Sequence, residues 1–459
     1  MLTQINPATS VDYPFERDQT LNIENIYNNT VDPNALNKYA KLPNNQEIMI
    51  IPEFELESGH VLKNAPVAYK TLGTLNETRD NVLVICHALS GSSDFEDWWG
   101  DLVGPGKPFD TNIFFIFCGN VLGSPYGSAS PMTINPETQR IYGPEFPLTT
   151  IRDDVRIHRE VLNRLNVKSV EYVIGGSLGG MQALEWAFFG TEYVHNVVAI
   201  ATCASQSAWG ISWDECQRQA IFSDPNFNYG YYTEDSTPDA GLAAARMQAM
   251  MTYRTRNSFQ ARFGRKIMQT SSTALKANNF MKHNEGNKSI RLNDPSHKKP
   301  LPHNLYNKQT IINQPVVYSA QSYLRYQGDK FIGRFDANCY VAITRKIDTH
   351  DISRDRASSV EEALGLIAQP TLVVGIASDA LFTANEQEEI ASHIPNNRIE
   401  WIESDDGHDA FLLEFKQMED ILIKFMREKT PQYEKLGIIT EDGNYKKPMK
   451  ASLFGEFEG

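Results

Sequence analysis

Short runs of almost uninterrupted apolar residues recur along this chain, separated by segments of a different character. They are Val82–Cys86, Ile113–Phe117, Val170–Ile174, Val197–Ala201, Leu372–Ile376 and Arg398–Ile402. Runs of this length and composition are typical of strands that are buried on both faces of a mostly parallel sheet. Two earlier segments, 47–57 and 66–72, also have the composition of strands, and Ser58-Gly59 is a turn signal after the first of them.

Segments with helical periodicity lie between several of these runs. In residues 151–165 apolar side chains recur on one face, and Thr150 with Asp153 predicts a capping-box start. Residues 178–189 and 410–426 are also apolar-periodic. Strands that alternate with helices indicate an α/β fold with a mostly parallel central sheet.

Residues 205–360 interrupt this alternation. They contain helix-forming pieces such as Ala240–Tyr253 but no run typical of a parallel strand. Within them, residues 283–314 are rich in Asn, Lys, Pro and His, which predicts a flexible surface insert. We therefore predict a polar N-terminal extension (1–46), an α/β core (47–204 and 361–430), a helical lid inserted into that core (205–360) and a C-terminal tail (431–459).

The composition argues against several classes of protein. Of the 459 residues, 41% are hydrophobic and 22% charged, and the net charge of −14 argues against a nucleic-acid or anionic-membrane binder. The five cysteines are scattered without a CxxC pair, so we expect a reducing compartment, no disulfide framework and no metal. No run reaches the roughly 18 apolar residues of a membrane span, and the N-terminus lacks a secretory signal, so we expect a cytoplasmic protein.

A Gly-x-Ser-x-Gly motif joins one strand-like run to one helical run. It spans Gly175–Gly179, with Ser177 at its centre, after the run Val170–Ile174 and before the helical pattern 178–189. A nucleophile elbow needs this strand–turn–helix context, with small residues around a serine at a cramped turn. The helix N-terminus beneath the serine supplies N–H groups and a positive dipole end, which favour a developing oxyanion. We interpret Ser177 as the nucleophile of an α/β-hydrolase fold that works through an acyl-serine.

A serine needs a base, and in this fold the acid and then the histidine follow it on loops after late strands. Asp379 follows the run Leu372–Ile376, and His408 follows the run Arg398–Ile402. We therefore predict a Ser177–Asp379–His408 triad.

Other histidines and acids compete for these roles. His350 is followed by an aspartate but lies in the inserted region, and His393 lies in a helical pattern, which favours a surface position. Asp405 and Asp406 could orient the histidine in place of Asp379, although adjacent loop acids are more often solvated.

The oxyanion hole of this fold uses the N–H after the nucleophile and a second N–H from the loop after an early strand. Leu178 supplies the first, and Leu89, in the loop after Val82–Cys86, is the predicted second donor. His87 precedes the serine, which is the wrong place for the base of this fold, so we expect a structural role for it.

Many segments of the chain, from about residue 47 to 426, resemble the homoserine O-acetyltransferases in order along the sequence. They include His87–Ser92, Trp98–Trp99, Gly104–Thr111, Asn120–Ser124, Gly176–Ala187, Gly241–Met247, Thr252–Arg254, Ser322–Phe331, Arg334–Asn338 and Gly407–Glu414. The polar insert and the long N-terminal extension resemble the fungal version. The chain departs from the family at Leu178, where Met is usual, and at Ser90, where Thr is frequent; the first change leaves the backbone donor in place.

The resemblance implies a ping-pong reaction in which acetyl-CoA, as a co-substrate rather than a cofactor, acetylates Ser177, and L-homoserine then takes the acetyl group for methionine biosynthesis. It also implies a homodimer and assigns the amino acid to Arg246, Tyr253 and Asp409. The chemistry agrees, because a guanidinium suits a carboxylate and a carboxylate suits an ammonium group.

Three other activities use the same triad. A homoserine O-succinyltransferase or a serine O-acetyltransferase differs from a homoserine O-acetyltransferase at a few pocket residues. A serine esterase differs by admitting water to the acyl-serine. A noncatalytic binding module of the same fold would not need the complete triad that the sequence predicts.

Overall fold

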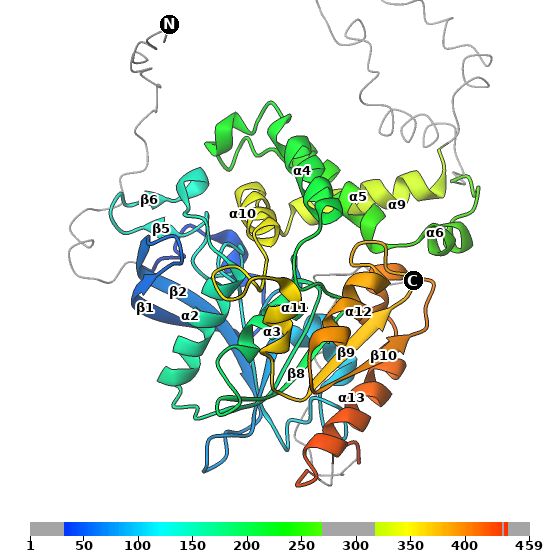
Figure 1. The fold of residues 1–459 in the computed structure, drawn as a ribbon. Coiled ribbons are helices and arrows are strands. Elements are labelled where there is room, and N and C mark those ends of the chain that lie inside the picture. Colours follow the sequence, from blue (N-terminus) through cyan, green and yellow to red (C-terminus); the bar gives the residue numbers. More distant parts are fainter. Residues whose placement is uncertain (1–31, 269–316, 434–435, 439–459) are drawn as a thin grey trace, which may run out of the picture.

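The protein, for which we have a computed structural model, is described over residues 32–268, 317–433 and 436–438. An eight-stranded sheet in the order β1-β2-β4-β3-β7-β8-β9-β10 forms its centre (Figure 1). The strands are β1 (Glu47–Glu55), β2 (Val61–Leu72), β3 (Val82–Cys86), β4 (Phe115–Gly119), β7 (Val170–Gly176), β8 (Val194–Ile200), β9 (Thr371–Ile376) and β10 (Asn397–Ile402). The predicted insert 283–314 lies outside the described residues, as do residues 1–31 and most of the C-terminal tail, so the predicted domain boundaries stay a prediction.

The prediction of a mostly parallel sheet is confirmed. Every neighbouring pair from β4 to β10 is parallel, and β2 alone is antiparallel to both of its neighbours. All six apolar runs contain a strand. The run Ile113–Phe117 becomes extended only at Phe115, because Ile113 and Phe114 donate their N–H groups to the carbonyl oxygen of Asp110 in a turn.

The sheet begins with a hairpin that is longer than predicted. The last residue of β1, Glu55, pairs with Val61, the first residue of β2. The second strand therefore starts at residue 61 and not at residue 66, where we predicted it. A second, two-residue hairpin of β5 (Ile134–Asn135) and β6 (Arg140–Ile141) was not predicted. It is too short to show an alternating pattern in the sequence.

Helices cover both faces of the sheet. The alternation of side chains along β3 sends Val84 into one apolar core and Leu83 into the other. The first core is completed by α2 (Ile151–Arg164), α3 (Leu178–Ala187), α11 (Val360–Gly365) and α12 (Ala384–His393), and the second by α1 (Phe95–Trp99) and α13 (Phe415–Lys429). The capping box predicted at the start of α2 is present, with both Thr150 and Asp153 in their reciprocal hydrogen bonds.

The helix expected over residues 410–426 is divided. Gly407–Leu412 form a 3₁₀ helix, and α13 begins only at Phe415. The short helix places Phe411 against the end of β7, where a Cβ added at Gly176 would lie 2.6 Å from its ring.

Between β8 and β9 the chain builds a helical lid. Figure 1 places its helices at one end of the molecule, at the top of the view. They are α4 (Ala208–Phe222), α5 (Asp239–Tyr253), α6 (Arg256–Arg262), α9 (Ser319–Ile332) and α10 (Ala337–Asp348). The chain leaves the core and returns to it at one place, since Gln206 N–H donates to His350 O at 2.9 Å and Ile352 N–H donates to Ala204 O at 3.1 Å.

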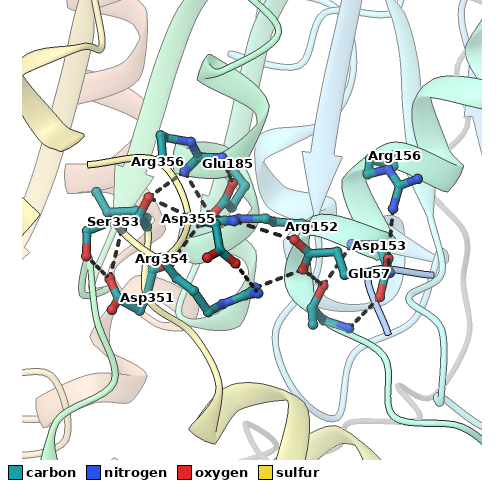
Figure 2. Close-up of polar contacts among 12 residues, drawn as sticks. Glu57, Arg152, Asp153, Arg156, Glu185, Asp351, Ser353, Arg354, Asp355 and Arg356 are labelled. Atoms are coloured by element: carbon teal, nitrogen blue, oxygen red, sulfur yellow. Dashed lines mark hydrogen bonds and ion pairs between the residues drawn. The ribbon is translucent and has the colours of Figure 1, made fainter. Parts of the chain in front are cut away.

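The returning chain is fastened to the core by a network of ion pairs (Figure 2). Arg356 contacts Glu185 of α3 at 2.8 Å, and Arg354 contacts Glu57, after β1, at 2.8 Å. Arg152 of α2 contacts Glu185 at 3.1 Å. The base of the lid is therefore fixed to α3, which begins at the Gly-x-Ser-x-Gly turn, and to the segment after β1.

Candidate active site

Ser177 occupies a strained turn between β7 and α3. Its backbone has φ 60° and ψ −125°, a conformation that costs energy for a residue with a side chain. The turn is also crowded: a Cβ at Gly175 would lie 2.1 Å from Gly179 O, and one at Gly179 would lie 2.1 Å from Cys86 O. The glycines are required by this close approach of backbones, as expected for a nucleophile elbow.

Asp379 and His408 form a buried pair at the carboxyl ends of β9 and β10. His408 Nδ1–H donates to Asp379 Oδ2 at 2.7 Å, and the other carboxylate oxygen accepts the N–H groups of Leu381 and Phe382. Burial lowers the pKa of His408, but the charge and hydrogen bond of Asp379, together with the charge of Asp409, outweigh it and leave the pKa above its ordinary value. The pair is thus arranged for His408 Nε2 to accept a proton.

Phe411 links this pair to the serine turn. Its ring packs against Gly176 and lies 5.4 Å from the His408 ring, centre to centre. Between the described residues, no hydrogen bond joins Ser177 Oγ to His408. Such hydrogen bonds are often long before a substrate is bound.

The segments that carry the two expected oxyanion donors touch each other. Leu178 is the first residue of α3, where helical N–H groups have no partner within the helix. The loop of Leu89 follows β3, and the α3 side chain of Gln182 donates to His87 O at 3.2 Å. Arg334 of the lid donates to Ser90 O at 3.2 Å, next to Leu89.

The three residues expected to hold the amino acid lie around His408. The Tyr253 ring, at the end of α5, is 6.0 Å from the His408 ring, and the Arg246 guanidinium lies 5.5 Å from the centre of the Tyr253 ring. Asp409 adjoins His408, and burial raises its pKa, although Arg254, His408 and Arg246 oppose the rise. The structure therefore brings Tyr253 and Asp409 next to His408, and Arg246 next to Tyr253.

Comparison with known proteins identifies the group to which this chain belongs. A family model of the alpha/beta hydrolase fold matches residues 81–415. Homoserine O-acetyltransferases of Emericella nidulans and Saccharomyces cerevisiae are 50% and 48% identical to it, over 93% and 96% of this chain and 96% and 97% of theirs. The chain belongs to the homoserine O-acetyltransferase family. As a homoserine O-acetyltransferase family member, it is an acyltransferase enzyme of the α/β-hydrolase fold.

Solved structures agree on the fold of this family member. A homoserine O-acetyltransferase from Bacillus anthracis is 24% identical, with a TM-score of 0.68 over 83% of this chain and 97% of that one. The esterase E22 is 25% identical, with a TM-score of 0.67 over 83% of this chain and 99% of that one. A common fold is thus shared by enzymes named for transfer and for hydrolysis.

Sequence reasoning missed Arg254, which follows Tyr253 directly. Its Nε contacts Asp409 Oδ2 at 2.9 Å, and its Nη1 contacts Asp406 Oδ1 at 2.6 Å. Asp406, expected among solvated loop acids, is instead ion-paired, and it does not orient His408. The sequence offered one signal, an arginine in the segment Thr252–Arg254 that resembles the family.

The competing histidines have other partners. His87 Nε2 accepts the N–H of Val121 at 3.0 Å and its Nδ1 lies 2.8 Å from Ala88 O, so it holds the loop after β3 in the structural role that we predicted. His350 contacts Cys203 O at the base of the lid, and burial lowers its pKa to about 4. His393 ends α12 on the surface, also as predicted.

A cavity of about 710 Å³ lies away from these groups. It is lined by residues such as Phe146, Phe227 and Arg345, at the junction of α10 with the turns after α4, and not by Ser177, Asp379 or His408. Its size does not make it the catalytic site, because it lacks a paired base and nucleophile.

The described residues contain neither a membrane-spanning helix nor a cluster of metal-ligating side chains. No helix among them is long and apolar enough to cross a membrane. Nor does that part of the chain contain a group of three or more His, Cys, Asp or Glu side chains that could hold a metal ion.

Proposed function

We propose that this enzyme transfers the acetyl group of acetyl-CoA to the side-chain hydroxyl of L-homoserine through an acetyl-Ser177 intermediate. The observation that carries the proposal is the buried Asp379–His408 pair, which Phe411 links to the strained turn of Ser177. The choice of an acetyl group and of homoserine as its acceptor follows the names of the fungal relatives, which are 46–50% identical over nearly the whole chain.

In the first half-reaction Ser177 Oγ attacks the thioester carbonyl of acetyl-CoA. His408 Nε2 takes the hydroxyl proton, and Asp379 stabilises the imidazolium that forms. The N–H groups of Leu89 and Leu178 hold the oxyanion of the tetrahedral intermediate. When this intermediate collapses, the C–S bond breaks and His408 returns the proton to the CoA sulfur, leaving acetyl-Ser177.

In the second half-reaction the acceptor hydroxyl takes the place of the CoA sulfur. Arg246 binds the carboxylate of homoserine, and Asp409 with Tyr253 binds its ammonium group. His408 takes the proton of the homoserine hydroxyl as that oxygen attacks the acetyl-serine, and it then returns the proton to Ser177 Oγ. The burial of Arg246 and Asp409, which are 2% and 4% exposed, supports a pocket closed to water.

Hydrolysis is the second candidate, favoured by the likeness to esterase E22. The decisive assay follows CoA thiol release from acetyl-CoA with homoserine, serine or water as the acceptor. Release that depends on homoserine is expected. Equal release with water alone would make the enzyme a hydrolase, and faster release from succinyl-CoA would make it a succinyltransferase.

The proposal extends to the setting of the reaction. Acetyl-CoA serves as a co-substrate, no cofactor takes part, and the product enters methionine biosynthesis. We further propose a cytoplasmic homodimer, which sedimentation of the purified enzyme and fractionation of the cell would test. The described cysteines are all free, in keeping with a reducing compartment.

A further inference from the structure

Arg254 lies where the lid meets the loop that carries His408. It follows α5, its side chain is 8% exposed, and its guanidinium bridges Asp406 and Asp409 on either side of the histidine. A planar fork with fixed donor directions defines the positions of two carboxylates at once. Arg254 therefore contacts, from the lid side, the catalytic loop on both sides of His408; we define this loop as residues 405–409.

The neighbours of Arg254 make further contacts with the same loop. Thr255 Oγ1 donates to Asp405 O, and Ser258 Oγ donates to Asp406 Oδ1. A Cβ added at Gly407 would lie 3.0 Å from Tyr253 O, so the two backbones approach closely there. The lid turn 253–258 and the loop 405–409 thus form one packed unit.

The core holds this loop through Ser378 and through the hydrogen bond between Asp379 and His408. Ser378, beside Asp379, donates its hydroxyl to Ser404 O at 2.7 Å and accepts the N–H of Gly407 at 3.2 Å. Asp405, Asp406 and Asp409 place three carboxylates within five residues, and like charges that lie near one another favour a cation between them. Arg254 is such a cation, and it contacts two of the three.

We propose that Arg254 is a positioning residue, which holds the loop 405–409 against the lid and so sets His408 and Asp409 in their working geometry. The proposal rests on the function proposed above. Because His408 serves both half-reactions, loss of Arg254 slows acetylation of Ser177 as well as transfer to homoserine. A role limited to binding homoserine through Asp409 would affect the second step alone.

The test measures acetylation of Ser177 by p-nitrophenyl acetate, which requires neither CoA nor homoserine. In the Arg254→Met variant we expect acetylation to slow about 100-fold, the typical cost of a small misplacement of a catalytic group. Arg254→Lys keeps the charge but reaches one carboxylate, so a loss of about tenfold is expected. The homoserine-dependent step, followed separately on acetyl-enzyme, should slow in parallel.

Arg218 provides the matched control. It is a lid arginine, its side chain is 6% exposed, and it contacts Glu215 at 2.9 Å and Asp348 at 2.7 Å, away from the catalytic loop. Arg218→Met should lower the melting temperature but leave acetylation within about threefold of wild type. An equal loss of acetylation in both variants would reduce Arg254 to a merely structural role.

The remaining outcomes are also decisive. Unchanged acetylation in Arg254→Met, with only the homoserine step impaired, would overturn the proposal. If Arg254→Met does not fold, Asp406→Asn decides, because it weakens one anchor of the loop: slower acetylation supports the proposal and wild-type acetylation overturns it. Failure of the proposed function would be detected in a different measurement, in which the wild-type enzyme releases CoA at a rate that does not depend on homoserine.

Discussion

Replacement of Asp379 by Asn tests the proposed role of Asp379, which is to hold the ring proton of His408 on Nδ1. The Asp379 Oδ1 atom accepts two backbone N–H groups at 2.8 and 3.0 Å, and its Oδ2 accepts from His408 Nδ1 at 2.7 Å. An asparagine keeps Oδ1 on the two backbone donors, so its NH₂ group must face His408. That amide donates to Nδ1, and the ring proton moves to Nε2.

A histidine with its proton on Nε2 cannot accept a proton from Ser177. We expect kcat to fall by about 10⁴, equivalent to about 5.5 kcal/mol of lost transition-state stabilisation. Stability should change by only about 1 kcal/mol, because the backbone contacts of the residue survive. The fall in kcat thus reports the tautomer and not unfolding.

The assay is homoserine-dependent thiol release from acetyl-CoA, with acetyl-Ser177 measured by mass spectrometry. Asp420→Asn is the matched control, since the Asp420 carboxylate is exposed on α13, where it contacts Lys416 at 2.7 Å; its rate should equal that of the wild type. An Asp379→Asn enzyme that folds and retains more than about a tenth of wild-type kcat would refute the assignment of the acid.

Three further outcomes follow from contacts described in the structure. His408 must be neutral to accept a proton, and its pKa is raised. The rate of acetylation by p-nitrophenyl acetate should therefore fall with decreasing pH, through a midpoint above about 6.5. A midpoint below about 6 would contradict this expectation. Gly179→Ala should destabilise the fold by about 3 kcal/mol in thermal unfolding, since the new methyl group meets a backbone carbonyl, whereas Gly365→Ala, with open space around it, should not. Lys346→Met leaves the buried Asp154 without its 2.7 Å partner and should cost about 3–5 kcal/mol in urea unfolding, part of which an added Asp154→Leu should restore.

Most of the sheet could be predicted because its strands are buried on both faces. A strand such as Val82–Cys86, in which every residue is buried, is apolar throughout, and this composition is visible in the sequence. The edges were less predictable. Residues Val61–Lys63 of β2 alternate in exposure, and their strand state depends on pairing with β1, which no local pattern records.

The Asp379–His408 pair could be predicted because chain order and strand context define it, whereas the partners of Asp409 could not. Asp379 and His408 each follow a recognisable strand, so their meeting follows from the topology of a parallel sheet. Arg254 meets Asp409 across 155 positions of sequence, between a lid and a loop whose relative placement depends on tertiary packing. The ion-pair partner of a charged residue cannot be predicted from the periodicity of the sequence.

The lid begins and ends at one point of the core, where the chain around Ala204–Gln206 is hydrogen-bonded to His350–Ile352. An insertion with joined ends imposes no strain on the sheet, whatever its length. The entropy of closing it grows only logarithmically, by about 0.6 kcal/mol for each doubling of the number of residues. Evolution can therefore lengthen, shorten or exchange this module while the strands that precede Ser177, Asp379 and His408 remain unchanged.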